Sequence, residues 1–296
     1  IRGGSGIYNT AIEGICSPVI INSIFSGNHT DSIGGAMVNV SVKVNSNIPV
    51  CSPIIINTVF SGNDASNTLN GLGRAGAVYN MLLNFASPAG TSPTLIPTFT
   101  NCIFWNNTAL NAGNVFYNEN TNNPNRPLIS YSIFQGPGGI NSANITGGGN
   151  NTLVGSTNKA NTDPLLVAAP LGSDAPTAEG NFRIKFFSPA LDMGLSSANN
   201  TPYDLDGNNR IQGASIDIGA YEFGVPECGL YAGALYVDTS ATGANNGRNW
   251  DSAFVDLQAA LQVALYCDID TIFVAQGTYY PSNPDTLYIC GSVDTV

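Results

Sequence analysis

The chain has 296 residues, enough for one large domain or two smaller ones with a buried core. It carries nine Lys and Arg against twenty Asp and Glu, a formal net charge of −11, and one His. This acidity argues against a nucleic-acid-binding protein, which needs a basic surface to displace counterions from phosphates. No apolar run of about 18 residues occurs, so we predict no transmembrane segment. The chain has neither an initiator Met nor a signal peptide, and we interpret it as an internal segment of a longer, processed chain.

The charge is unevenly distributed along the chain. Residues 1–160 hold five basic and four acidic residues, whereas residues 161–296 hold four basic and sixteen acidic ones. The first half is therefore nearly uncharged, and it is rich in Asn, Gly, Ser and Thr. Regular apolar runs interrupt this polar background, which favours an internal repeat over disorder.

One apolar motif recurs four times in the first half. Each copy places a Pro seven residues before a Phe, and the copies are offset by 35, 44 and 30 residues. The four copies are Pro18 to Phe25, Pro53 to Phe60, Pro97 to Phe104, and Pro127 to Phe134. A second motif alternates with the first and ends in Asn9, Asn39, Asn80 and Asn118. Both runs are short and rich in β-branched residues, so they predict strands rather than helices.

A constant strand separated by loops of variable length is typical of a solenoid, in which each repeat buries its apolar side chains by stacking on the next. We therefore predict an all-β fold, a right-handed parallel β-helix over residues 1–160, with a β-sandwich as the rival. Stacking at about 4.8 Å would align the four Phe residues in one internal stack. A second stack would contain Ile20, Ile55, Phe99 and Ile129. Asn22, Asn57 and Asn101 fall at strand corners, where Asn tolerates a left-handed backbone.

Two tetrapeptides carry a resemblance to known families. Phe-Ser-Gly-Asn at 25–28 and 60–63, alternating with Gly-Gly-Ala-Met at 34–37, resembles the short repeats of polymorphic outer-membrane proteins and related bacterial surface adhesins. More broadly, the repeats are similar to pectate-lyase-like right-handed β-helix proteins. The resemblance covers residues 1–160 and implies an extracellular protein of the bacterial cell surface.

The acidic half resembles a different part of such proteins. Three ordered motifs, Ser188–Asp192, Asp204–Gly207 and Asp217–Glu222, resemble the terminal region of bacterial surface proteins of the choice-of-anchor type. This resemblance implies that residues 161–223 form an acidic cap that closes the β-helix, ahead of whatever fixes the protein to the cell. No membrane anchor or sorting tail is evident after it.

A new start follows the acidic region. Residues 224–234 are predicted to be a linker, and residues 235–296 the N-terminal part of a second β-helix module. Leu235–Asp238 and Thr271–Ala275 predict strands, and the apolar spacing from Phe254 to Leu265 predicts a helix at about 251–266. The resemblance implies that this helix caps the first repeat of the new module and hides its edge. Tandem modules in one long extracellular chain are the simplest interpretation.

A calcium site is the one cofactor site that the sequence suggests. Asp204, Asp206 and Asn208 place side-chain oxygens at alternate positions around Gly207, and Asp217 would add another if the chain folds back. Calcium suits such spacing because a hard cation takes several oxygens on a tight turn. The alternative is an Asx-type turn, in which the Asp side chains cap backbone amides.

We predict no catalytic residues. A glycosidase needs two carboxylates on either side of one bond, and residues 1–160 contain only Glu13, Asp31, Asp64 and Glu119. Asp31 and Asp64 follow equivalent Asn residues, so stacking would bring them near each other, yet solvated loop tips are the favoured interpretation. His29 is the only histidine, which excludes a pair of His ligands, and we expect it to be exposed.

The cysteines and three aromatic residues leave alternatives open. Cys16 and Cys51 occupy equivalent positions in successive repeats, so they form either a disulfide or a pair of free thiols. Cys102 is predicted to be a small buried side chain, and the pairing of Cys228, Cys267 and Cys290 stays open. Trp105, Tyr117 and Tyr131 form either a sugar-binding strip or an interface between chains.

The leading hypothesis for function is a non-enzymatic module of a very large bacterial surface protein, an adhesin or filament shaft. Its expected partners are adjacent modules of the same chain, further copies in a homo-oligomer or filament, and glycans or other cell surfaces. The alternatives are a polysaccharide-degrading β-helix enzyme, lyase or hydrolase, and a trimeric fibre or tailspike. Asp-Ser/Thr-aliphatic triplets, such as the one at Asp31, resemble the O-glycan acceptor motif of Bacteroidota secreted proteins.

Overall fold

The computed structural model of the chain describes residues 6–66, 72–85, 92–119, 127–135, 145–147, 152–153, 157–185, 188–224, 226 and 228–280. The chain divides into two compact units, Ile1–Gly224 and Val225–Val296. Strands dominate the first unit, and an α-helix packs on two strands in the second. No helix in the part of the chain that the structure describes is long and apolar enough to cross a membrane.

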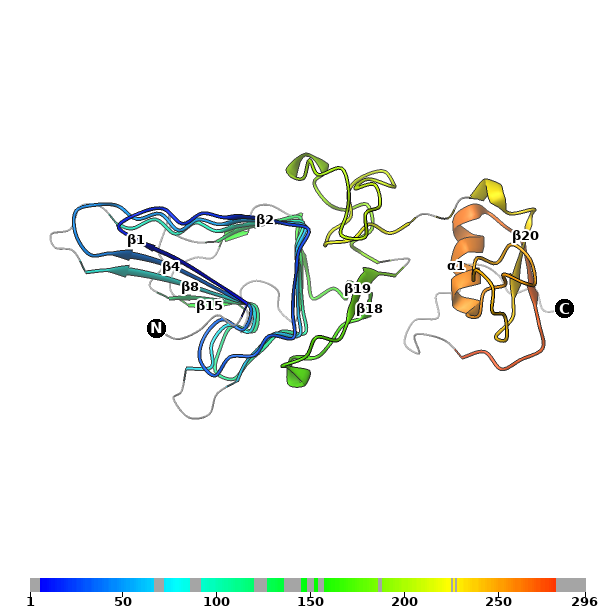
Figure 1. Cartoon of the computed structure of the whole chain (residues 1–296), viewed down its shortest axis with the longest axis horizontal. Helices are drawn as coiled ribbons and strands as arrows, with labels where there is room; N and C mark the ends of the chain where they lie inside the picture. The colour runs from blue at the N-terminus through cyan, green and yellow to red at the C-terminus, as the bar shows by residue number, and fades with distance from the viewer. Residues whose placement is uncertain are drawn as a thin grey trace. The chain divides into compact units, whose positions relative to one another are not determined.

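Three parallel five-stranded sheets make up most of the first unit (Figure 1). Sheet 1 has the strand order β1-β4-β8-β12-β15, sheet 2 the order β2-β5-β9-β13-β16, and sheet 3 the order β3-β6-β10-β14-β17. Each sheet thus takes one strand from each of five successive repeats, which we number from β1–β3 (repeat 1) to β15–β17 (repeat 5). The prediction of a mostly β fold with parallel sheets is confirmed, and the fifth repeat adds to the four motif copies found in the sequence.

The strands are short, apart from those at the start of sheet 1. In sheet 1 they are β1 Ile7–Ile12, β4 Met37–Lys43, β8 Val78–Asn84, β12 Phe116–Glu119 and β15 Ile145–Gly147. In sheet 2 they are β2 Val19–Ile21, β5 Ile54–Ile56, β9 Thr98–Thr100, β13 Leu128–Ser130 and β16 Thr152–Leu153. In sheet 3 they are β3 Ile24–Ser26, β6 Val59–Ser61, β10 Ile103–Trp105, β14 Ile133–Phe134 and β17 Lys159–Ala160.

Equivalent residues of successive repeats pair in register, as the motif spacing predicts. Phe25, Phe60, Phe104 and Phe134 are aligned in sheet 3, with ring centroids 5.0, 4.9 and 5.2 Å apart and nearly parallel rings. Ile20, Ile55, Phe99 and Ile129 are aligned in the same way in sheet 2. Both predicted stacks are therefore confirmed, and together they form the centre of the buried core.

Lines of Asn side chains run alongside these apolar stacks. In sheet 1 the amides of Asn9, Asn39, Asn80 and Asn118 bond to one another in sequence, at 2.8, 2.9 and 2.8 Å. Beyond the end of sheet 3, Asn28 donates to Asn63, and Asn63 donates to Asn107, both at 2.8 Å. A buried amide is costly unless it is hydrogen-bonded, and the amides of Asn9, Asn39, Asn80, Asn28 and Asn63 each donate to the Asn of the next repeat.

The residues after the repeats lie along the side of the stack. We call residues 161–223 the acidic segment; it contains the antiparallel pair β18 Leu166–Ala168 and β19 Asn181–Ile184 and two 3-10 turns, Gly172–Asp174 and Ser196–Ala198. Side chains alternate along a strand, so the residue before each stacked Phe lies on the opposite face of sheet 3, away from the Phe stack. These outward residues pack on the acidic segment: Ile24, Val59, Ile103 and Ile133 contact a cluster that includes Phe182, Ile184 and Ile218.

The acidic segment therefore flanks sheet 3, and the closing cap that the resemblance implied stays a prediction. Thr177 reaches the first repeat, where its N–H donates to the carbonyl of Gly27 at 3.0 Å. The physical reason is the outward row of aliphatic side chains on sheet 3, which buries apolar surface only if the chain folds back along it. The loops that follow β6 and β10 contain one further parallel pair of short strands, β7 Asp64–Ala65 and β11 Thr108–Ala109.

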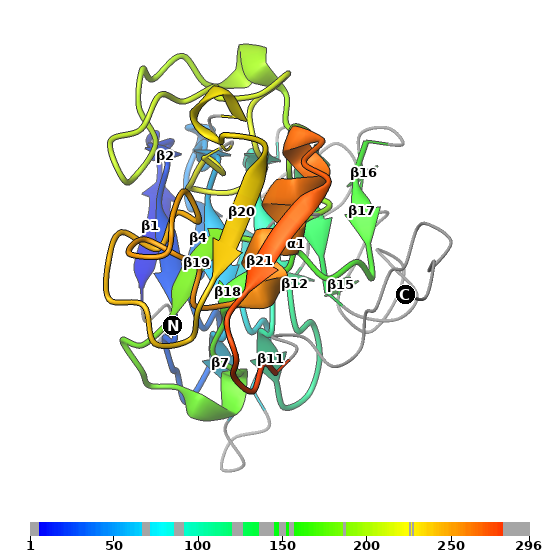
Figure 2. The same cartoon turned by 90° about the vertical axis from the view of Figure 1, so that its right-hand side faces the viewer.

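The second unit is a small parallel pair of strands covered by a helix. β20 Ala234–Val237 and β21 Thr271–Val274 lie side by side, and helix α1 Leu257–Cys267 packs on both (Figure 2). The helix begins at Leu257 and not near residue 251, because Asp256 caps it by accepting the N–H of Gln258 at 2.8 Å. A 3-10 turn, Cys228–Leu230, occupies part of the region that the sequence predicted as a linker.

Candidate functional site

The corner between sheets 2 and 3 is the place where the stack holds the acidic segment. Asn22, Asn57 and Asn101 all have left-handed backbones there, with φ of 48, 47 and 56°, as predicted. Each side-chain amide points outward and donates to the acidic segment: Asn22 to Thr201 and Tyr203, Asn57 to the carbonyls of Asp217 and Gly219, and Asn101 to the carbonyl of Leu195. The corner is therefore a docking line for the acidic segment.

The hydrogen bonds between these corner amides run partly through the acidic segment. Asn101 donates directly to Asn57 at 3.1 Å, but Asn199 of the acidic segment stands between Asn57 and Asn22. Its amide donates to Asn22 at 2.9 Å and to Asn57 at 3.1 Å. In the fourth repeat the corner residue is Tyr131, which keeps the left-handed φ of 48° but has no amide to offer.

Asp204 organises the loop that the sequence marked as a calcium site. Its carboxylate accepts the N–H groups of Asp206 at 2.9 Å and Asn208 at 2.8 Å, and the N–H of Glu222 at 2.9 Å. Asp204 is 7% exposed, so these bonds satisfy a buried charge. This is the Asx-type turn that was the alternative to calcium.

The other acidic residues of the loop are also engaged. Asp206 accepts from Nε of Arg183 at 2.6 Å, and the guanidinium of Arg183 lies 4.5 Å from the ring centroid of Tyr221. Asp217 is 1% exposed, and its two oxygens accept the N–H groups of Asp192 at 2.7 Å and Phe223 at 2.6 Å. Asp217 thus closes the loop from residue 217 to residue 223 and joins it to Asp192.

A buried ion pair lies behind this loop. Arg210 is 3% exposed, and Nη1 lies 3.4 Å from Oε1 of Glu222 while Nη2 donates to the carbonyl of Gly219 at 2.8 Å. Burial raises the pKa of Glu222 to about 8, and the neighbouring Asp217 carboxylate adds to that rise. Burial likewise raises the pKa of Asp217 to about 6, and it lowers the pKa of Arg210. These groups contact the peptide that docks on Asn57, so they support the docked segment.

The four predicted calcium ligands do not converge on a common point as free oxygens. Asp204 and Asp217 face N–H donors, Asp206 faces Arg183, and the Asn208 amide lies 3.4 Å from Asp204. Within the described ranges, no group of three or more His, Cys, Asp or Glu is arranged to hold a metal ion. These oxygens fit an intrinsic hydrogen-bonded turn, and calcium binding stays a prediction.

His29, which we expected to be exposed, lies between two carboxylates from successive repeats. Its Nδ1 is 2.8 Å from Oδ2 of Asp64, its Nε2 is 3.2 Å from Oδ1 of Asp31, and its side chain is 30% exposed. Asp64, expected to be a solvated loop tip, is 5% exposed and also accepts the hydroxyls of Ser66 and Thr108. Only the stacking register, which pairs His29 with Asp64, brings these residues together.

A hollow of about 550 Å³ opens beside His29, between the loop after β3 and the acidic segment. Its walls include Asn28 and His29 on one side and Pro176 and Thr177 on the other. An Asp that orients one ring nitrogen of a His leaves the other nitrogen for proton transfer in many hydrolases. Here the second nitrogen is next to Asp31, so the arrangement offers a His between two carboxylates at the rim of an open cavity.

The three candidate aromatic residues do not form a strip. Trp105 is in sheet 3 and packs against the acidic segment, Tyr117 is in sheet 1, and Tyr131 is at the corner after β13. Tyr117 stacks on Tyr79 with ring centroids 5.5 Å apart, and Arg74 lies 4.8 Å from its centroid. A single ligand on one face therefore cannot contact all three.

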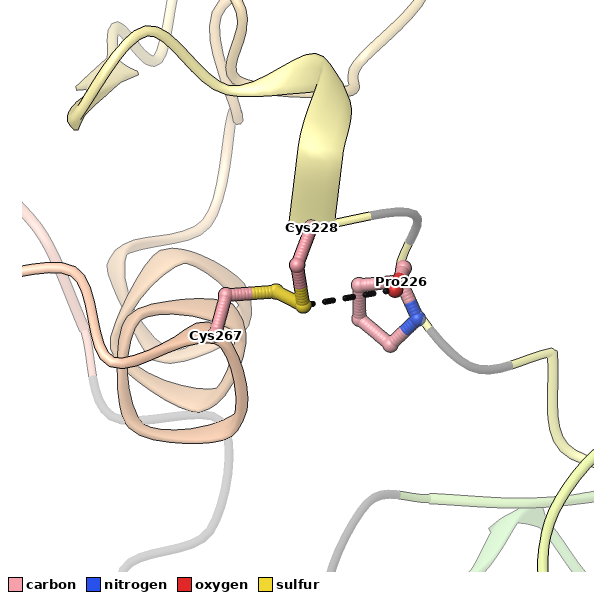
Figure 3. Close-up of a disulfide and its surroundings, with 3 residues drawn as sticks. All are labelled: Pro226, Cys228 and Cys267. Atoms are coloured by element: carbon pink, nitrogen blue, oxygen red, sulfur yellow. Dashed lines mark hydrogen bonds between the residues drawn. A yellow bond between two sulfur atoms is a disulfide. The ribbon is translucent and has the colours of Figure 1, made fainter.

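The cysteines of the two units differ in state. Cys16, Cys51 and Cys102 are free thiols, and Cys102 is buried as predicted. Cys228 and Cys267 form a disulfide that ties the 3-10 turn to the end of α1, with Cα atoms 5.2 Å apart (Figure 3). The sequence had left the pairing of these cysteines open. Cys290, the third of them, lies outside the described residues.

Comparison of the chain with known proteins finds no matching family model, no matching curated protein and no matching solved structure. The resemblance to bacterial surface proteins therefore stays a prediction from the sequence motifs.

Proposed function

We propose that this chain is a non-enzymatic structural and adhesive module of a large bacterial cell-surface protein. The finer fold that we assign to residues 1–160 is the right-handed, pectate-lyase-like parallel β-helix. In this proposal the acidic segment braces its side, and residues 235–296 begin a second module of the same kind. The module would connect to its neighbours in one extracellular chain and present its surface to glycans or other cells.

One observation carries the proposal: equivalent side chains and backbones are joined along a single direction, from repeat to repeat. In parallel sheets the backbone hydrogen bonds lie across the strands, which here means along the direction of stacking. The Asn line from Asn9 to Asn118 and the Phe line from Phe25 to Phe134 follow the same direction. Force along that direction is shared by many bonds, as a shaft requires.

Single-molecule force spectroscopy on the whole chain tests the structural half of this proposal. Pulling from the two ends should give successive unfolding steps, each releasing about the length of one repeat, because neighbouring repeats supply most of the contacts of a solenoid. Asn80→Ala removes two links of the buried Asn line and should lower the force of the corresponding steps, while Asn84→Ala at the end of the same strand serves as the matched control. Extension at low force without steps would contradict the proposal.

The adhesive half has its own test. Beads coated with the whole chain should be retained on a panel of neutral and acidic glycans or on cell surfaces, and beads coated with heat-unfolded chain should not. Equal retention of the two kinds of bead, or none on any surface, would leave the chain as a shaft without an adhesive role.

A second candidate function, polysaccharide cleavage, is favoured by one specific observation, the position of His29 between Asp31 and Asp64 beside an open hollow. Incubation of the chain with acidic and neutral polysaccharides distinguishes the two functions. Under the leading proposal no new reducing ends or unsaturated products form. Product formation that His29→Gln abolishes would replace the structural proposal with an enzymatic one.

A further inference from the structure

Cys16 and Cys51 occupy neighbouring positions on two successive repeats. Ile15 and Val50 form a parallel bridge, and the N–H of Cys16 donates to the carbonyl of Val50 at 2.8 Å. Equivalent residues on adjacent parallel strands lie about 4.8 Å apart, which falls within the usual Cα separation of disulfides. The Cys16 side chain packs against the cluster that contains Cys51.

The two thiols differ in exposure. Cys51 is 0% exposed, whereas Cys16 is half-buried. Burial raises the pKa of the Cys51 thiol to about 12, and the neighbouring Cys16 adds to the rise. Since the thiolate is the reactive form, Cys16 is the residue that an oxidant reaches first.

We infer that Cys16 and Cys51 form an oxidation site, at which a low-molecular-weight disulfide converts the two thiols into a covalent bond between the first and second repeats. In the first step the Cys16 thiolate attacks the small disulfide, forms a mixed disulfide and releases one small thiolate. In the second step the Cys51 thiolate attacks Cys16 Sγ, forms the intramolecular disulfide and releases the second small thiolate. Both cysteines lose a proton, and the small disulfide is reduced to two thiols.

The position of the pair gives this bond a structural consequence. The pair lies beside the Ile15–Val50 bridge, where the backbones of repeats 1 and 2 already pair. A covalent bond there would limit local opening between these two repeats. This inference does not depend on the proposed function.

Peptide mapping of the whole chain after exposure to oxidised glutathione tests the inference. Cleavage after Lys and Arg separates residues 3–43, which contain Cys16, from residues 44–74, which contain Cys51, and Cys102 lies beyond Arg74. We expect the first two peptides to be linked, with the glutathione adduct of Cys16 as the intermediate. The second step should accelerate about tenfold per pH unit between pH 7 and 9, because it needs the Cys51 thiolate.

Variants separate this result from other pairings. Cys16→Ser should leave Cys51 unmodified, because its thiol is buried. Cys102→Ser is the matched control: Cys102 is equally buried, its in-register neighbours are Thr58 and Ser132, and its loss should leave the link intact. Hydrogen exchange of β2 amides in the oxidised chain should slow by about tenfold or more. Linkage of Cys16 to Cys290 or to a second chain, or a Cys16 that stays unmodified, would overturn the inference.

Discussion

Asn57 joins two parts of the chain that are 160 residues apart in the sequence: its side-chain amide donates a hydrogen bond of 2.8 Å to the carbonyl of Asp217. The same amide donates to the carbonyl of Gly219 at 3.0 Å, and its oxygen accepts from Asn101 and Asn199. Asn57 is 0% exposed and has a left-handed backbone. One side chain thus turns the corner of the repeat and fixes the acidic segment.

Asn57→Gly should lower the free energy of unfolding by about 2–4 kcal/mol, because two buried carbonyls lose their donor while the left-handed backbone is kept. Asn57→Ala should cost about 1 kcal/mol more, since Ala is strained at that φ. Chemical denaturation of the two variants measures both effects. Asn22→Gly, at the more exposed corner of the first repeat, is the control and should cost less. Equal losses at the two corners would contradict the role assigned to Asn57.

Phe60 lies in the middle of the aromatic stack, between Phe25 and Phe104, and is fully buried. Phe60→Ala should lower the free energy of unfolding by about 3–5 kcal/mol through lost apolar burial and the cavity that remains. Phe25→Ala, at the partly buried end of the same stack, should cost less. Thermal unfolding followed by circular dichroism compares the two, and a larger loss at Phe25 would show that the stack is not the core.

Tyr131 occupies the left-handed corner that Asn fills in three other repeats. A bulky aromatic residue is unfavourable there, because its Cβ crowds the neighbouring backbone. Tyr131→Asn should therefore raise the free energy of unfolding by about 1 kcal/mol. The denaturation midpoint measures this gain, and a loss of stability would mean that contacts of the Tyr131 ring outweigh the backbone strain.

The buried carboxyls make stability depend on pH. The folded-state pKa values of Asp217 and Glu222, about 6 and about 8, lie above the unfolded values of roughly 3.9 and 4.3. The folded form therefore binds these protons more tightly. Their contribution to stability is complete below about pH 4, and it is lost as the pH rises through about 6 for Asp217 and about 8 for Glu222.

Melting temperatures recorded from pH 4 to 9 check this dependence. Glu222→Gln mimics the protonated side chain, so the variant should match the wild type near pH 4 and lack the part of the decline between about pH 4 and 8 that Glu222 causes. An unchanged decline in the variant would assign the effect to other groups.

Calcium removal is expected to leave the melting temperature unchanged. The carboxylates of Asp204 and Asp217 are already satisfied by backbone N–H groups, so the loop is stable without a cation. Scans in chelator and in millimolar calcium test this. A calcium-dependent rise that Asp206→Asn abolishes would instead support the calcium site predicted from the sequence.

The repeats could be read from the sequence because each copy carries its own strand signal. The constant spacing from Pro to Phe, together with the two-residue period of a strand, determined which residues point inward and which partner each one meets. The Phe stack and the left-handed corner Asn residues followed from that pattern. The fifth repeat was missed because it keeps neither the Pro nor the Phe of the other copies: β17 is only Lys159–Ala160.

Tertiary structure alone decided what lies outside the stack, because those contacts join segments with no shared pattern. The sequence placed acidic residues 161–223 after the repeats. Only folding back along the outward aliphatic row of sheet 3 brought Asp217 into contact with Asn57, and it placed Asn199 between Asn22 and Asn57. The sequence likewise placed His29 and Asp64 in different repeats, but the distance between their side chains did not follow from it. Register fixes neighbours within a sheet, whereas loops and flanking segments are placed by burial and hydrogen-bond satisfaction over the whole unit.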